Sequence, residues 1–297
     1  MRKHILPIAV LAVLQGCAHN VDYDASGAFE ATEITVSAEV TGRIVSFDAD
    51  EGSEVSEGQT VCSIDSTALL LQRRTQEQQQ RALQSGNPDS RKQLSALKDQ
   101  ITKQRTEVAR VEALYKDDAA TEKQVDDVRA QLSILQSQYD ATLSSLSKSS
   151  ASIDGNVAVV SSQIDQLDYN ISRCVVSSPV HGTILTKYAQ AGEVTAVGKP
   201  LFKVADLGNM FLRAYFTSDQ LSSVNIGQQV RVVADFGGGE QVDYPGTVTW
   251  ISSESEFTPK SIQTRDSRAA LVYAVKVSVK NDGRLKIGFY GEVYLDR

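Results

Sequence analysis

The sequence predicts an α+β chain in which a small split β-sandwich is interrupted by a long antiparallel α-helical coiled-coil hairpin and followed by a small β-barrel. Three observations support this prediction. Residues 36–65 and 174–207 form a gap-free repeat, a long helix-forming insertion separates the two halves, and the C-terminal stretch is rich in strand-forming residues. A chain of 297 residues has room for about two or three domains.

Residues 1–16 have the pattern of a secretory signal. A short basic start precedes an apolar stretch from Ile5 to Leu14, which is too short to span a bilayer. The Leu-Gln-Gly-Cys sequence that ends at Cys17 resembles a bacterial lipobox, in which Cys17 becomes the acylated first residue. An ordinary signal peptide with a chance cysteine is the alternative. Acyl chains would anchor the protein to a membrane without crossing it, in an oxidising compartment.

Charge and motif content exclude several classes of function. The chain carries 30 basic and 37 acidic residues, a net charge of −7, and loss of Arg2 and Lys3 with the signal leaves 28 − 37 = −9. A net acidic surface argues against a nucleic-acid partner. The three histidines are isolated, zinc-ligand spacing and phosphate-binding loops are missing, and we expect no catalytic residue, metal site or cofactor. The sequence therefore predicts a protein that is not an enzyme.

The repeat is the strongest signal in the sequence. When Val36 is aligned with Val176 and no gap is allowed, eight of the thirty positions from 36 to 65 are identical to their counterparts. Gly52 and Gly58 then fall on Gly192 and Gly198. Matched glycines indicate matched turns that need positive φ. Neither half is long enough to bury a core alone, so we expect the halves to close one sandwich, preceded by a linker or strand over 17–35.

This split module resembles the lipoyl/biotinyl domain, which is built from two such halves. In carrier proteins of that family a modified lysine occupies the tight turn between them. Here residues 66–173 replace the turn and its lysine is missing. The resemblance therefore gives the fold and makes a biotin or lipoyl carrier a minor alternative.

Residues 66–173 are predicted to form two antiparallel helices joined by a turn near 117–120. Heptad positions are apolar in both arms, which is typical of a coiled coil. The first arm would reach about 75–80 Å if fully helical. Gly86-Asn87-Pro88-Asp89 breaks one arm and 149–156 disturbs the other. Because the two breaks would face each other, we expect one joint across the hairpin; two unrelated irregularities are the alternative.

The predicted turn carries Arg110, Leu114, Thr121 and Asp126. Their spacing resembles the hairpin-tip motif of periplasmic adaptor proteins of the HlyD/AcrA type (membrane fusion proteins), with Thr121 in place of a serine. The resemblance implies that this tip docks onto a TolC-like outer-membrane channel. Two other interpretations stay open. Thr121 with Gln124 forms a capping box, and Arg110 could pair with a neighbouring carboxylate.

Residues 208–297 read as a β-barrel with one short helix at 218–224. This stretch resembles the barrel of HlyD-family adaptors, especially lipoproteins associated with ABC exporters. The resemblance implies an inner-membrane transporter as partner, with the ABC type favoured over a proton-driven pump, and a homo-hexamer. It also implies a periplasmic location with the lipid anchor in the inner membrane; Ala18 after Cys17 leaves the outer membrane possible.

Cys62 and Cys174 fall on strands that are antiparallel neighbours in the lipoyl fold. A cross-strand disulfide is therefore expected as one possibility, and two buried thiols are the other. Taken together, the resemblance implies an adaptor of a tripartite export or efflux system. The alternative is a cell-envelope lipoprotein scaffold whose coiled coil binds another protein without forming a transport conduit.

Overall fold

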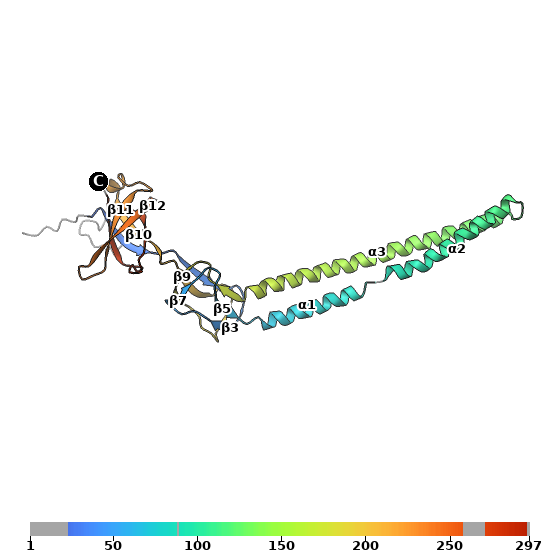
Figure 1. The fold of residues 1–297 in the computed structure, drawn as a ribbon, viewed down its shortest axis with the longest axis horizontal. Helices are drawn as coiled ribbons and strands as arrows, with labels where there is room; N and C mark the ends of the chain where they lie inside the picture. The colour runs from blue at the N-terminus through green and yellow to red at the C-terminus, as the bar shows by residue number, and fades with distance from the viewer. Residues whose placement is uncertain (1–22, 88, 258–270, 296–297) are drawn as a thin grey trace, which may run out of the picture.

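Three bodies follow one another end to end in the computed structural model, which describes residues 23–87, 89–257 and 271–295. A β-barrel lies at one end, a β-sandwich in the middle and a helical hairpin at the other end (Figure 1). The chain passes through the sandwich on its way into the hairpin and again on its way out. The three-body architecture predicted from the sequence is confirmed.

The sandwich consists of two four-stranded sheets. Their strand orders are β2-β9-β7-β4 and β6-β5-β3-β8. The strands are β2 (Glu33–Ser37), β3 (Gly42–Phe47), β4 (Glu54–Val55), β5 (Thr60–Ile64), β6 (Val175–Ser177), β7 (Gly182–Lys187), β8 (Val194–Thr195) and β9 (Pro200–Ala205). Each sheet thus takes strands from both halves of the repeat, so neither half folds into a sheet of its own.

Each strand of one sheet has its repeat counterpart in the other sheet. The alignment pairs β2 with β6, β3 with β7, β4 with β8 and β5 with β9, and the counterparts occur in the same order across the two sheets. The hydrogen bonds follow the same rule: Gly52 N donates to Ile184 O and Gly192 N to Ile44 O, both at 2.8 Å. Gly52 and Gly192 have φ of 86° and 94°. The two halves therefore close one sandwich, as the repeat predicted, and the structure shows that this sandwich has internal quasi-twofold symmetry.

Thr195 is a flaw in this symmetry. It lies in β8 where the first half has Val55, and both side chains are 1% exposed. The Thr195 hydroxyl has no hydrogen-bond partner. A buried hydroxyl without a partner costs about 1–3 kcal/mol.

We expect Thr195→Val to raise the free energy of unfolding by about 1 kcal/mol, because the change removes an unpaired hydroxyl at nearly constant shape. The matched change Val55→Thr should lower it by about 1–3 kcal/mol at the symmetric position. Urea denaturation followed by circular dichroism measures both. If both changes altered the free energy of unfolding by similar small amounts, the Thr195 hydroxyl would not be a buried group without a hydrogen-bond partner.

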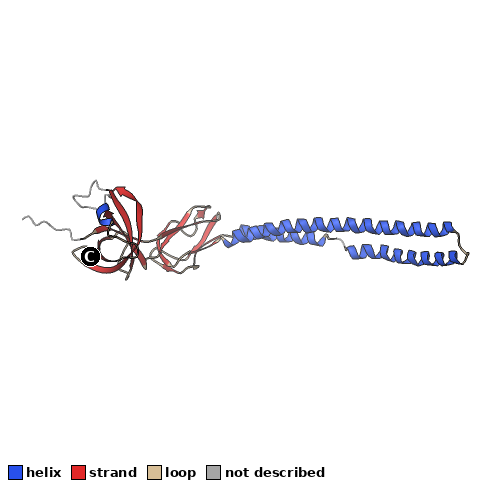
Figure 2. Cartoon of the chain, turned by 90° about the horizontal axis from the view of Figure 1, so that it is seen from above, coloured by secondary structure: helices blue, strands red, loops and turns tan. Residues whose placement is uncertain are grey.

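The hairpin is made of α1 (Thr67–Ser85), α2 (Ser90–Lys116) and α3 (Glu122–Ser172). Helices α2 and α3 pack against each other, with Ile101 and Val111 buried on α2 and Val125 and Leu146 buried on α3. The 51 residues of α3 span about 77 Å at 1.5 Å per residue. Figure 2 shows this helix running the full length of the hairpin alongside both α1 and α2.

The predicted joint across both arms is wrong for the returning arm. The first arm is interrupted between Ser85 and Ser90, but α3 continues through 149–156 without a break. Glycine costs only about 1 kcal/mol in a helix interior, whereas proline removes a hydrogen bond and clashes with the preceding turn. One intact helix therefore bridges a gap in its partner.

The barrel is closed by six strands in the order β1-β10-β13-β12-β11-β14. They are β1 (Ala25–Glu30), β10 (Asn209–Thr217), β11 (Gln229–Asp235), β12 (Gln241–Phe257), β13 (Leu271–Lys280) and β14 (Tyr290–Tyr294), with the short helix α4 (Ser218–Leu221) after β10. The barrel was expected to consist of residues 208–297 alone, and this expectation left out one strand. Part of 17–35 supplies β1, which completes the barrel and buries Phe29 in its core.

Two connections join the barrel to the sandwich, and the one from β9 to β10 is held by side chains. The Asp206 carboxylate accepts from Gly208 N and from the Asn209 amide. The Asn281 amide donates to Leu207 O at 2.8 Å, and Asn281 N donates to Gly208 O at 3.0 Å. These contacts fix the connection to a barrel loop, so the two β-domains are coupled by hydrogen bonds as well as by the chain.

Candidate functional site

The hairpin tip is a compact, fully capped turn between α2 and α3. Ala119 N donates to Leu114 O at 2.8 Å, and Asp118 has a φ of 58°, the only positive value for a non-glycine residue in the described chain. Thr121 and Gln124 form the predicted capping box, with Thr121 N donating to Gln124 Oε1 at 2.8 Å. The structure thus confirms the capping role of Thr121, which starts α3 at a fixed place.

Arg110 is paired within its own helix. Its guanidinium donates to the Glu107 carboxylate through Nε at 2.9 Å and through a terminal nitrogen at 2.5 Å. The hydrogen bond from Arg110 lowers the pKa of Glu107, and the same bond raises the pKa of Arg110. The Arg110 side chain is still 61% exposed. The predicted carboxylate pair is therefore present, and the guanidinium edge stays accessible to a partner.

Arg110 and Leu114 line one groove at the tip. The groove has a volume of about 370 Å³, and its walls come from both helices and the turn: Glu107, Arg110, Val111, Leu114, Ala119, Ala120, Gln124, Asp127 and Val128. Leu114 is 36% exposed there. The aspartate that lines the groove is Asp127, whereas the predicted Asp126 is exposed and does not line it. Two of the four predicted tip residues therefore share this groove, Thr121 caps the adjoining helix, and Asp127 was missed.

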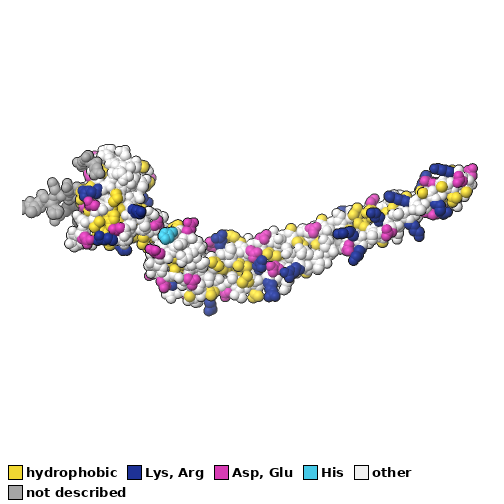
Figure 3. All heavy atoms as spheres, in the orientation of Figure 1, with side chains coloured by type: hydrophobic (Ala, Val, Ile, Leu, Met, Phe, Trp, Pro, Cys, Tyr) yellow, Lys and Arg dark blue, Asp and Glu magenta, His cyan; other side chains and the backbone are white. Residues whose placement is uncertain are grey.

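The charges of the distal hairpin are mixed in sign. Figure 3 shows Lys and Arg side chains gathered over this part of the molecule with acidic side chains between them. Arg129 of α3 pairs with Glu112 of α2 across the hairpin, at 2.7 Å, and is 59% exposed. This pair resembles that of Arg110 in exposure and partner type, but Arg129 does not line the groove.

The two cysteines at the hairpin neck are free thiols, and both are buried. Cys62 is opposite Val176 in the β5–β6 register, whereas Cys174 O accepts from Ile64 N. The cysteines are thus two positions out of register. The cross-strand disulfide considered above is not present in this structure, and the alternative of two buried thiols describes it.

Burial raises the pKa of the Cys62 thiol to about 11, so at pH 8 only about one thiol in a thousand is ionised. In a mature Cys17→Ala chain we expect alkylation of the native protein to be at least about a hundredfold slower than that of a free cysteine. The rate should rise about tenfold for each pH unit up to that pKa. Denaturation without reductant should release two reactive thiols; their absence would demonstrate a disulfide.

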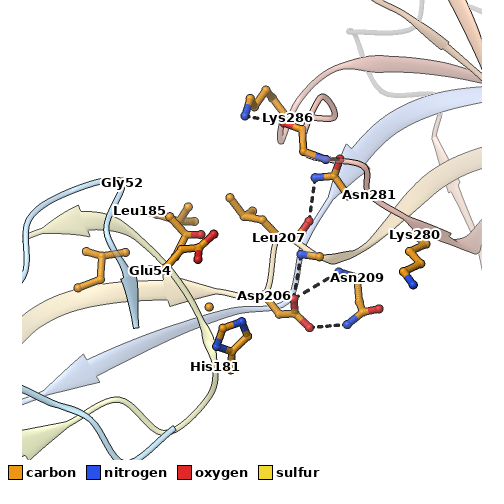
Figure 4. A pocket seen from close by; sticks show the side chains of 15 residues that line it. Gly52, Glu54, His181, Leu185, Asp206, Leu207, Asn209, Lys280, Asn281 and Lys286 are labelled. Carbon is orange, nitrogen blue, oxygen red and sulfur yellow. Dashed lines mark hydrogen bonds between the residues drawn. The ribbon is translucent and has the colours of Figure 1, made fainter. Parts of the chain in front are cut away.

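A hollow lies between the sandwich and the barrel. Its volume is about 790 Å³, and it contains His181, which the sequence placed alone in a turn. Figure 4 shows the His181 ring next to Asp206, and Lys280 and Lys286 of the barrel line the same hollow. Hydrogen bonding from Asn209 lowers the pKa of Asp206, with a further contribution from His181. The hollow therefore surrounds the coupled connection and has charges of both signs.

Over residues 23–87, 89–257 and 271–295, no group of three or more His, Cys, Asp or Glu side chains is placed to hold a metal ion. Within the same ranges, no helix has the length and apolar content needed to cross a bilayer. Cys17, the predicted acylation site, lies outside the described residues.

Comparison with known proteins agrees with this architecture. A protein named "UPF0194 membrane protein" from Yersinia pseudotuberculosis serotype O:3 is 25% identical over 314 aligned residues, covering 94% of this chain and 93% of its own. A protein of the same name, encoded in the asrC 5′ region of Acidithiobacillus ferridurans, is 31% identical over 119 residues, covering 40% of this chain and 35% of its own.

Among solved structures, MacA from Actinobacillus actinomycetemcomitans has a similar fold, with a TM-score of 0.57 and 20% identity over 91% of this chain and 76% of its own. A MacA–MexA chimera with the MexA α-hairpin of Pseudomonas aeruginosa has a TM-score of 0.51 and 19% identity, and the match covers 91% of this chain and 79% of the chimera. A family model for the CzcB-like, barrel-sandwich hybrid domain matches residues 32–206, which include the sandwich and the whole hairpin. The chain therefore belongs to the CzcB-like barrel-sandwich hybrid family.

Proposed function

We propose that this protein is the periplasmic adaptor of a tripartite export system. In this proposal Cys17 is acylated and holds the barrel end at a membrane, with the inner membrane favoured. The barrel and sandwich engage an inner-membrane transporter of the ABC type, and the tip docks onto a TolC-like outer-membrane channel. Several copies, six by family resemblance, would be needed to enclose a conduit.

The observation that carries the proposal is the position of the tip groove. A capped turn presents the partly exposed Leu114 and the accessible guanidinium of Arg110 at the end of a helix about 77 Å long. A buried tip could not serve as a docking point, whereas this one is capped and exposed. The barrel and the sandwich lie at the opposite end of the molecule from the tip (Figure 1), so the molecule has the form of a bridge.

Charge reversal at the tip tests the proposal. We expect Arg110→Asp to reduce export at least about tenfold and to abolish in-cell cross-linking between a photoreactive residue at position 120 and an outer-membrane channel, because one buried interface charge typically contributes about 2 kcal/mol or more. The matched control is Arg129→Asp, which breaks a similar ion pair outside the groove. It should leave export within about twofold.

Unchanged export and cross-linking with Arg110→Asp would refute channel docking at this tip and would favour the scaffold alternative. A loss of helicity in both variants would instead show a folding defect. Circular dichroism of the purified proteins therefore accompanies the transport assay.

A further inference from the structure

The barrel end that points away from the sandwich carries an unusual pair of side chains. Strand β10 leaves the sandwich at Asn209 and reaches the far end of the barrel at Thr217, which is opposite Val272 of β13. One position further along, Phe257 of β12 is opposite Leu271. This register places Phe257 and Leu271 together at the barrel end that lies furthest from the hairpin.

Both side chains are open to solvent. Phe257 is 80% exposed and Leu271 is 52% exposed, whereas the adjacent Val272 is 4% exposed in the barrel wall. The neighbouring Glu256 is paired with Arg213 at 2.7 Å, so its charge is compensated where it adjoins Phe257. Two large apolar side chains directly opposite each other at the end of a strand pair mark an interaction surface rather than a core.

The start of the described chain lies at the same barrel end. Ala25 of β1 is opposite Val293, Asp24 N donates to Val293 O at 2.9 Å, and the Asp24 carboxylate accepts from Leu295 N at 2.8 Å. Only six residues lie between Cys17 and Asp24, and the seven steps from one Cα atom to the next span at most about 25 Å. If Cys17 is acylated, as the proposed function has it, this barrel end is held within that distance of a lipid surface.

We propose that Phe257 and Leu271 form a second membrane contact, inserting into the boundary between headgroups and acyl chains of the membrane that holds the N-terminus. Aromatic and aliphatic side chains gain free energy at this boundary without requiring a spanning segment. The contact would fix the orientation of the barrel on the membrane, which a flexible acyl tether alone leaves free. It thereby aims the hairpin away from the bilayer.

The test uses a mature chain with Cys17→Ala, so that acylation plays no part, and zwitterionic phosphatidylcholine vesicles, so that the acidic chain is not repelled. We expect this protein to float with the vesicles and the double variant Phe257→Ser/Leu271→Ser to bind at least about tenfold more weakly. The control is Ile134→Ser on the distal hairpin, a side chain that is 59% exposed. It should bind like the parent.

A fluorescence measurement gives a second readout. The chain has one tryptophan, Trp250. In a Trp250→Phe background, Phe257→Trp should show blue-shifted emission on addition of vesicles, whereas the native Trp250 should not. Failure of the parent chain to float, equal flotation of the double variant, or an unshifted emission would overturn the proposal and leave a protein surface as the occupant of this end. Channel docking at the tip is unaffected by these outcomes, since it is measured by the Arg110→Asp assay.

Discussion

Replacement of Gly27 by alanine is expected to prevent closure of the barrel. A Cβ atom at this position would lie 1.9 Å from Arg213 O and 2.7 Å from the Ala214 Cα, both backbone atoms of β10. Backbone atoms of a paired strand cannot move aside as a flexible side chain can. Because β1 closes the barrel between β10 and β14, we expect the change to cost about 3 kcal/mol or more, at the upper end of single-residue effects.

The matched control is Gly155→Ala, a glycine-to-alanine change in the middle of α3, where a Cβ would meet nothing within 4 Å. Alanine is favoured over glycine in a helix interior by about 0.5–1 kcal/mol, so this change should stabilise the hairpin. Thermal unfolding followed at a β-sensitive and a helix-sensitive wavelength measures both variants. Similar stability of the Gly27→Ala and parent proteins would show that β1 does not close the barrel in solution.

Shortening the hairpin is expected to abolish export without unfolding the protein. Removal of residues 94–100 from α2 together with residues 136–142 from α3 deletes one heptad from each arm. The apolar seam is kept in register, and the reach is reduced by about 10 Å. A docking interface cannot form across such a gap, so transport should fall to the level of a strain lacking the protein.

The control for this deletion is a compensated variant. Reinsertion of a different heptad into each arm, with the same apolar positions, should restore the length and with it most of the export. Export that tolerates the deletion would contradict a bridge of fixed length, while failure of the compensated variant would assign a role to the deleted side chains themselves. Circular dichroism checks that both proteins stay folded.

The repeat was a reliable guide to the sandwich because glycines report backbone geometry directly. Gly52 and Gly192 need positive φ in both halves, so their alignment fixed the positions of the turns and hence of the strands between them. The heptads predicted the α2–α3 pairing for a similar reason, since burial of Ile101 and Val111 follows from spacing alone. Local rules repeated at a fixed interval are therefore readable from one sequence.

The places of β1 in the barrel and of Asp127 in the tip groove depend on packing between segments, whereas the continuity of α3 is a local property that the sequence pattern misjudged. The assignment of β1 to the barrel requires pairing with β10 and β14, both of which follow the entire hairpin in the chain, and no local pattern encodes such a pairing. The continuity of α3 was missed because Gly155 suggested a break, although the helix tolerates it. At the tip, Asp126 and Asp127 are adjacent in sequence, and only the rotation of α3 about its axis decides which of them lines the groove.

The symmetry of the sandwich has a mechanical consequence. The repeat alignment carries Asp65, where the chain leaves for the hairpin, onto Ala205, where it leaves for the barrel. A pull on the hairpin therefore enters one sheet through β5 and β6, while the opposing pull of the barrel enters the other sheet through β2 and β9. The two sheets are joined by the chain at 38–41 and 178–181 and by the packed side chains of the core, including Val61 and Leu201. We therefore expect tension along the molecule to load this hydrophobic layer in shear.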